Sequence, residues 1–153
     1  MRLMVIALAL ACGGGPACAA TSSGYAALAV AALVGGYSPV LGTPEKSVLR
    51  TAFDGEALAG AATIRVKADS VVCHAGDVDI SAFGCDLKFG AKAVHLTGRQ
   101  ANELFASLTD MGVATDGAAG TIYVSVSKLR CVVDPAKISH RDGGGADCDY
   151  AVQ

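Results

Sequence analysis

The spacing of apolar residues along the chain predicts two amphipathic helices. The first covers residues 44–54, where apolar side chains recur at helical intervals after a good N-cap residue, Thr43, and before Gly55, which is able to end the helix. The second covers residues 98–111 and begins with a capping-box pattern at Thr97. Its alanine, leucine and phenylalanine residues form one stripe, so this helix is expected to pack against a sheet.

Alternating apolar and polar residues predict strands in the middle of the chain. Residues 62–68 alternate cleanly, and the strand continues to Cys73 after an irregularity at Ser70, where the apolar positions change parity. Residues 85–96 have the pattern of a hairpin that turns at Gly90. These segments are typical of strands with one buried face.

The C-terminal third predicts further strands and completes the fold class. A strand is expected from Ile122 to Val133, with a bulge near Ser127, and a short last strand is expected at 147–152. Residues 116–120 are expected to form a loop. This order of elements predicts an α+β fold, in which a mostly antiparallel sheet of about four to five strands packs against the helix at 98–111.

The first residues of the chain have the pattern of a secretory signal peptide. A positive residue, Arg2, precedes the apolar run Leu3–Ala11, and Gly13–Pro16 then breaks the helix. Small residues stand at Ala17 and Ala19, the two positions that a signal peptidase recognises. We therefore expect residues 1–19 to be a signal peptide that directs the protein to the periplasm or out of the cell.

Two alternatives to a cleaved signal peptide stay open at this stage. Cys12 follows a degraded lipoprotein box and would carry a lipid anchor. The second alternative is an uncleaved membrane anchor that includes the apolar stretch Tyr25–Val34. This stretch is far shorter than the ~20 residues needed to span a bilayer, so no transmembrane span is expected. Residues 20–42 are expected to be an Ala/Gly-rich leader or a loosely packed helix, and residues 43–153 a single α+β domain.

The cysteines predict disulfides. Signal-peptide cleavage leaves four cysteines in an oxidising compartment: Cys73, Cys85, Cys131 and Cys148. The local pairs Cys73–Cys85 and Cys131–Cys148 are favoured, although a crossed pair such as Cys73–Cys131 is an alternative. Each local loop would stabilise the domain by about 3 kcal/mol in the chain-entropy model. A zinc site is less well supported, because the spacings match no paired-knuckle pattern.

Composition and charge argue against two classes of protein. With 52% hydrophobic residues and a mean hydropathy of +0.46, the chain is not an intrinsically disordered tail. The 12 basic and 14 acidic residues show no basic excess, and without tryptophan the chain has few residues for base stacking, so no nucleic-acid partner is expected. Four basic residues would share one sheet face if their strands are neighbours, and a solvated face is expected there: Arg65, Lys67, Lys128 and Arg130.

The histidines suggest no catalytic pair. His74 follows Cys73, and adjacent strand residues point to opposite faces, so the two are poorly placed as a nucleophile and its base. His95 is expected to face solvent from the second hairpin strand, and His140 precedes a glycine-rich loop.

Carboxylates gather at two places. Asp77 and Asp79 would lie on one face of an extended segment, where they suit acid–base chemistry or cation binding, although an acidic loop is the simpler interpretation. Asp142, Asp147 and Asp149 flank the glycine-rich loop and are weak calcium-ligand candidates, since they lack the EF-hand register. We therefore expect no catalytic residue, no bound metal and no cofactor.

A set of short motifs between Thr43 and Asp149 suggests kinship with known proteins. The motifs are Pro44-Glu45-Lys46-x-Val48-Leu49, Phe53-Asp54-Gly55, Cys85-x-Leu87-x-Phe89-Gly90, Ala101-x-x-Leu104 and Gly143-Gly144-Gly145-Ala146-Asp147-Cys148. In this order they resemble small exported alphaproteobacterial proteins of unknown function. The resemblance implies export and a compact domain with paired cysteines, and it implies no catalytic residue and no ligand.

The sequence as a whole favours a non-enzymatic exported module. Such a module would bind a protein or an envelope component through the exposed face of its sheet. Two other hypotheses remain, a lipid-anchored structural protein of the envelope that uses Cys12, and a small periplasmic metal-dependent hydrolase that uses Asp77, Asp79 and His74.

Overall fold

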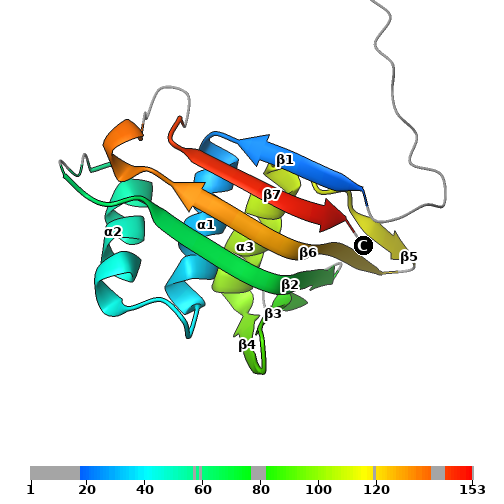
Figure 1. Cartoon of the computed structure of the whole chain (residues 1–153). Coiled ribbons are helices and arrows are strands. Elements are labelled where there is room, and N and C mark those ends of the chain that lie inside the picture. Colours follow the sequence, from blue (N-terminus) through cyan, green and yellow to red (C-terminus); the bar gives the residue numbers. More distant parts are fainter. Residues whose placement is uncertain are drawn as a thin grey trace, which may run out of the picture.

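A sheet of seven strands carries three helices on one of its faces in the computed structural model of the chain (Figure 1). The structure describes residues 18–56, 58, 60–76, 82–118, 120–138 and 144–152. In these residues the elements are β1 (Ala19–Ser23), α1 (Tyr25–Tyr37), α2 (Thr43–Asp54), β2 (Ile64–Gly76), β3 (Gly84–Phe89), β4 (Lys92–Thr97), α3 (Gly98–Asp110), β5 (Asp116–Ala118), β6 (Thr121–Val133), the 3-10 helix η2 (Pro135–Lys137) and β7 (Ala146–Val152).

The strands follow the order β1-β7-β6-β2-β3-β4, and β5 pairs with the start of β6. Neighbouring strands are antiparallel, so the predicted α+β class and antiparallel sheet are confirmed. The predicted count of four to five strands was too low. Ala19–Ser23 has no alternating pattern, and Asp116–Ala118, expected as a loop, pairs with β6 although its centre is Gly117.

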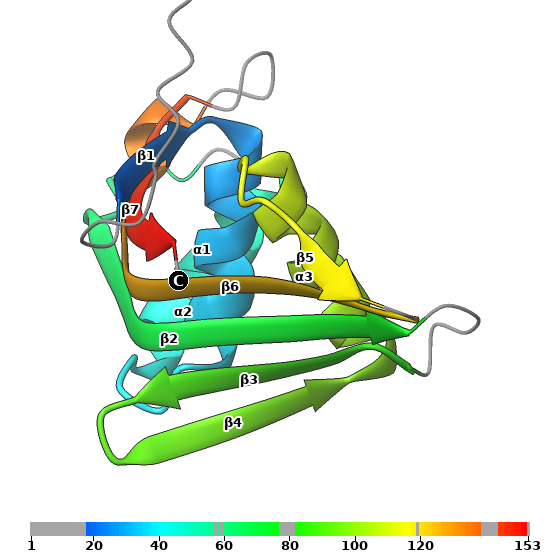
Figure 2. The same cartoon turned by 90° about the vertical axis from the view of Figure 1, so that its right-hand side faces the viewer.

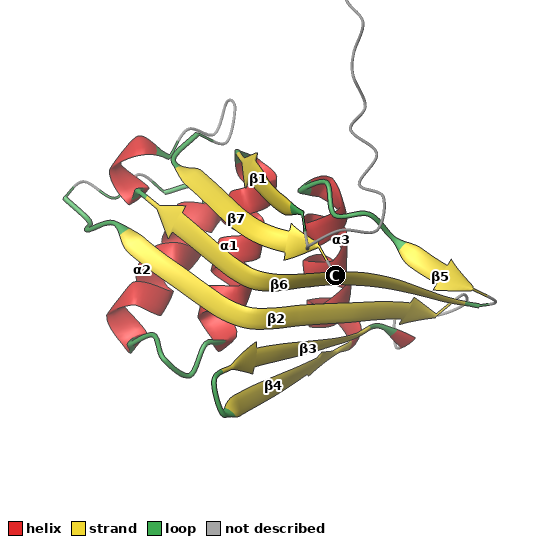
Figure 3. Cartoon of the chain, turned by 45° about the vertical axis from the view of Figure 1, so that its right-hand side comes forward, coloured by secondary structure: helices red, strands yellow, loops and turns green. Residues whose placement is uncertain are grey.

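Helix α1 is the centre of the domain rather than a leader or a loosely packed helix. Figure 3 shows α1 behind the middle of the sheet, and its Ala27, Val30, Ala31 and Val34 are fully buried. A helix that is apolar on all sides is typical of a core element, which explains why it gives no amphipathic pattern. Among the described helices, none combines the length and apolarity needed to cross a membrane.

Gly35 lets α1 approach both α2 and the sheet. A Cβ atom at this position would lie 2.6 Å from Cδ1 of Leu49 in α2 and 3.1 Å from Cγ2 of Val66 in β2. Both neighbours are fully buried. The close contact that this glycine permits therefore sets how near α1 lies to α2 and to β2.

The ends of the two predicted helices differ in detail from the sequence interpretation. Helix α2 ends at Gly55 in a left-handed conformation with φ 98°, as predicted, but it begins after Gly42, so Thr43 lies inside the helix. Thr97 is the N-cap of α3 by position, but its side chain makes no capping hydrogen bond. The predicted capping box is therefore not formed.

A bulge in β6 lies where the change of parity predicted it. The inward-facing residues change from Val126 to Leu129, and the pairing with β7 shifts by one residue between Ser127 and Arg130. Lys128, between them, has φ 54°. The extra residue lets β6 bend while both of its halves keep an apolar inner face.

Strand β2 changes parity at the same level, which accounts for the irregularity expected at Ser70. Its inward-facing residues change from Ala68 to Val71, and these pair with Leu129 and Val126 of β6. Because both strands change parity together, their register is preserved. Figure 2 shows the two strands bending side by side, so that the sheet curves around α1.

Two disulfides join neighbouring strands, in the two local pairs that the sequence favoured. Cys73–Cys85 links β2 to β3, with Cα atoms 4.0 Å apart, and Cys131–Cys148 links β6 to β7, with Cα atoms 4.1 Å apart. All four residues face the helices and are at most 1% exposed. The bonds therefore cross-link the sheet from inside the core.

Each disulfide lies directly beneath a helix. Sγ of Cys148 is 3.4 Å from the carbonyl oxygen of Ala27 in α1, and Sγ of Cys85 is 3.4 Å from the carbonyl oxygen of Ala101 in α3. The sulfur atoms thus belong to the surface on which the two helices pack. Removal of either disulfide would remove packing as well as a covalent link.

Strand β1 includes part of the predicted signal peptide. Ala19 pairs with Ala151 of β7, and Cys18, immediately before the strand, is disulfide-bonded. The cleavage point predicted between Ala19 and Ala20 falls within this strand. Processing at that point stays a prediction from the sequence.

The buried phenol of Tyr150 predicts a loss of stability at alkaline pH. Tyr150 is 5% exposed, and its hydroxyl donates a 3.5 Å hydrogen bond to the carbonyl oxygen of Met111. Burial raises its pKa above the usual 10.0, which means that the folded state favours the neutral phenol. The corresponding stability is complete below the unfolded-state pKa and is lost as pH rises through the folded-state pKa.

Between neutral pH and pH values above about 10, we therefore expect the free energy of unfolding to fall less in Tyr150→Phe than in the wild type. Urea unfolding of both proteins at the two pH values measures this difference. The matched control is Tyr123→Phe, because Tyr123 is 46% exposed. A wild-type alkaline slope in the Tyr150 variant would contradict this assignment.

Candidate functional site

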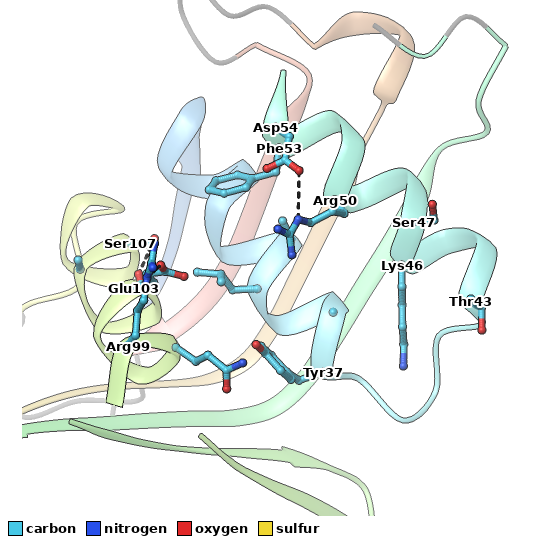
Figure 4. A pocket seen from close by; sticks show the side chains of 15 residues that line it. Tyr37, Thr43, Lys46, Ser47, Arg50, Phe53, Asp54, Arg99, Glu103 and Ser107 are labelled. Carbon is cyan, nitrogen blue, oxygen red and sulfur yellow. Dashed lines mark hydrogen bonds and ion pairs between the residues drawn. The ribbon is translucent and has the colours of Figure 1, made fainter. Parts of the chain in front are cut away.

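A groove of about 1030 Å³ lies between α2 and α3, with α1 as its floor (Figure 4). The floor consists of small or apolar residues, Ala32, Leu33 and Gly36. A Cβ atom on Gly36 would meet no other atom within 4 Å, so the space above this residue is open. The groove lies where two helices flank a third that has the small residues Ala32 and Gly36 on its outer side.

The walls of the groove carry two ion pairs. On α2, Nε of Arg50 lies 3.1 Å from Oδ2 of Asp54, and on α3, Nε of Arg99 lies 2.9 Å from Oε1 of Glu103. Both arginine side chains are at least 80% exposed, so each pair contributes little to stability. Their effect on the groove is to neutralise its two carboxylates.

Lys46 gives the groove a net positive charge. It is half-buried in the α2 wall, and it forms no ion pair with any other described residue. The groove therefore has three cationic side chains against two carboxylates that already have arginine partners. The full chain, in contrast, has a formal charge of −2.

The two ends of the groove differ in chemistry, as Figure 4 shows. Tyr37, Lys46 and Arg99 lie toward one end, and Phe53 lies toward the other. The Phe53 ring stacks on Tyr25 of α1, with ring centroids 5.7 Å apart. One end of the groove is thus rich in hydrogen-bond donors, and the other end carries the Phe53 ring beside the Arg50–Asp54 ion pair.

Charges on both walls of the groove shift the pKa of Tyr37. Burial raises the pKa of its phenol, the charge of Glu103 raises it further, and the charge of Arg50 lowers it. Its hydroxyl makes no hydrogen bond to another described residue. At neutral pH the hydroxyl is protonated and is free to donate a hydrogen bond into the groove.

His74 packs over the sheet, whereas its neighbour Cys73 lies in a disulfide on the opposite face, as the strand geometry predicted. Its ring lies against Gly84, where a Cβ atom would clash with it, and its centroid is 6.3 Å from that of Tyr123. This contact covers a glycine in the paired strand. It gives His74 a structural role on the outer face of the sheet.

His95 faces solvent from β4, and its Nδ1 lies 2.7 Å from Oδ1 of Asp86 in the paired strand. Asp147 and Asp149 are exposed on β7, and Oδ1 of Asp149 accepts a 2.8 Å hydrogen bond from Thr21 in β1. Within the described ranges, no three His, Cys, Asp or Glu side chains come close enough to hold a metal ion. The other candidates lie outside the described residues, namely Cys12, Asp77, Asp79, His140 and Asp142.

Three of the four basic strand residues do share the outer face of the sheet. Lys67 of β2 is directly opposite Arg130 of β6, and Arg65 is two residues along β2 from Lys67, opposite the exposed Val132. We call Arg65, Lys67 and Arg130 the basic cluster. Arg130 is also directly opposite Asp149 of β7, so an opposite charge borders the cluster on that side. The fourth basic residue, Lys128, is not counted in the cluster; it lies at the bulge of β6, where its φ is 54°.

Sequence interpretation missed the groove, because its residues come from three helices and their relative placement leaves no local pattern. The Gly35-Gly36 pair inside an apolar segment was the one signal that something packs or opens there.

No family model, no curated protein and no solved structure matches the chain. The resemblance to exported alphaproteobacterial proteins thus stays an expectation from the sequence.

Proposed function

We propose that this protein is a non-enzymatic binding module of an oxidising, exported compartment, and that its ligand lies in the groove between α2 and α3. One observation carries the proposal, the apolar floor that is left open at Gly36 beneath walls with hydrogen-bond donors. A small-molecule site has this combination of an apolar concave surface with a few polar groups that fix orientation.

The proposed compartment rests on the cysteines. The two buried cross-strand disulfides persist where the surroundings are oxidising, and the predicted signal peptide supports the same location. The periplasm or the cell exterior therefore suits the chain. We expect the ligand to be part of a protein or of an envelope component in that compartment.

Substitution of Gly36 by phenylalanine tests the groove. The new ring would occupy open space, so we expect the variant to fold and the groove to be filled. The probe is anilinonaphthalene sulfonate, whose fluorescence rises on apolar surfaces. We expect the wild type to bind the probe, with amide chemical-shift changes in α1, α2 and α3, and Gly36→Phe to lose at least about tenfold in affinity.

The matched control is Ala93→Phe, which adds the same ring at an exposed position of β4. It should leave probe binding as in the wild type. Probe binding that survives in Gly36→Phe, or shift changes that avoid the three helices, would reject the groove as the ligand site.

The basic cluster is the second candidate binding surface, and it corresponds to the exposed sheet face that the sequence favoured. Its three positive charges, Arg65, Lys67 and Arg130, suit an anionic partner, and Asp149 of β7, directly opposite Arg130, balances only one of them. The same chemical-shift experiment separates the two surfaces, since changes centred on β2 and β6 would assign binding to the cluster.

The two other hypotheses from the sequence depend mainly on residues that the structure does not describe. A lipid-anchored envelope protein would need Cys12, and a metal-dependent hydrolase would need Asp77 and Asp79. Its third residue, His74, is occupied in packing over Gly84. The described residues thus give these hypotheses no added support.

A further inference from the structure

We propose that the groove selects an elongated apolar molecule with one anionic head group, bound with its head group at the end of the groove where Tyr37 and Lys46 lie and its apolar body along α1 toward Phe53. This inference rests on the proposed function, because it names the class of ligand for the same groove. It commits to the sign of the head group and to the direction in which the ligand lies.

The donor-rich end of the groove supplies the partners for an anion. The hydroxyl of Tyr37 and the ammonium group of Lys46 make no hydrogen bond or ion pair with another described residue. Both line the groove, and both are half-buried, which strengthens their interaction with a charged group relative to full exposure. A carboxylate, sulfonate or phosphate ester accepts hydrogen bonds from either group.

The acidic groups of the groove do not compensate for Lys46. Asp54 and Glu103 each already accept a charge-assisted hydrogen bond from an arginine on their own helix. A cationic head group would therefore meet Lys46, while both carboxylates among the described lining residues already have arginine partners. This difference predicts selection for negative over positive charge at equal apolar content.

The rest of the groove suits an apolar body. Ala32, Leu33 and Gly36 form its floor, and the ring of Phe53 lies at the far end, beside the Arg50–Asp54 ion pair. Along α2, Phe53 is seven residues beyond Lys46, which corresponds to about 10 Å at 1.5 Å per residue. The ligand body is therefore expected to be elongated along the helices.

The experiment compares two single-chain amphiphiles of equal length, decanoate and decyltrimethylammonium, by isothermal titration calorimetry below their micelle concentrations. We expect the wild type to bind decanoate at least about tenfold more tightly. Lys46→Glu should weaken decanoate binding by about tenfold or more, and Tyr37→Phe by several-fold. Lys92→Glu on β4 makes the same charge change at an exposed residue outside the groove lining and should have no effect.

Each other outcome overturns a defined part of the inference. Two outcomes would reject the anionic head group: equal affinity for both amphiphiles, or an unchanged decanoate affinity in Lys46→Glu. If Gly36→Phe nevertheless loses the binding of both amphiphiles, the groove remains a ligand site. Decanoate binding that persists in Gly36→Phe would reject the groove itself, and with it the proposed function. Chemical-shift changes around Arg65, Lys67 and Arg130 would move the anion to the basic cluster.

Discussion

Replacement of both Cys131 and Cys148 by alanine is expected to lower the free energy of unfolding by at least about 3 kcal/mol. The disulfide closes a loop of 17 residues, and its loss restores that conformational freedom to the unfolded chain. A further loss comes from packing, because Sγ of Cys148 touches the backbone of Ala27 beneath α1. The measurement is urea unfolding of both proteins under non-reducing conditions.

A second comparison separates the two contributions. When both proteins are fully reduced, the loop constraint is absent from each, so the remaining difference reports the lost packing alone. We expect this remaining difference to be smaller than the first. A loss below about 1 kcal/mol under non-reducing conditions would show that the bond does not constrain the unfolded chain as the loop model requires.

Gly145→Ala is expected to destabilise the protein by about 3 kcal/mol, from backbone strain and steric overlap together. Gly145 has φ 98°, and a Cβ atom there would lie 2.8 Å from the carbonyl carbon of Lys137 and 2.9 Å from the amide nitrogen of Ile138. Both are backbone atoms, so no side-chain rotation relieves the overlap. The carbonyl oxygen of Gly145 also accepts a 2.8 Å hydrogen bond from Asp134, so a shift would disturb the start of β7.

Gly112→Ala is the matched control, because Gly112 has the same φ of 98° but its nearest contact for a Cβ atom is the Tyr150 hydroxyl at 4.0 Å. It should cost only about 1 kcal/mol, the strain of the left-handed conformation. Thermal unfolding of both variants gives the comparison. Equal losses in the two proteins would contradict the steric part of the prediction.

Local patterns were sufficient where one element packs one apolar face. The stripe Ala101, Leu104 and Leu108 predicted α3, and all three are fully buried. The change of parity near Ser127 predicted the bulge in β6, because a strand cannot otherwise keep apolar residues on one face. In each case the periodicity of the side chains carries the information about burial.

The same patterns were insufficient for α1 and for the groove. A helix that is apolar on all sides has no polar face, so Ala27 and Val34 could not be distinguished from a leader segment by periodicity. The groove depends on how α2 and α3 sit on α1. That arrangement is determined by packing at residues such as Gly35, whose small size acts only in the assembled fold.

The contact between Ala27 and Cys148 joins residues 121 positions apart, and this separation has a consequence for biosynthesis. Helix α1 is made before β6 and β7, the strands that cover one side of it. Until those strands are made, α1 can pack against α2, β2 and α3, but the apolar side that meets Cys148 has no covering strand. A chain truncated before β7 would leave this side of α1 uncovered and prone to aggregation.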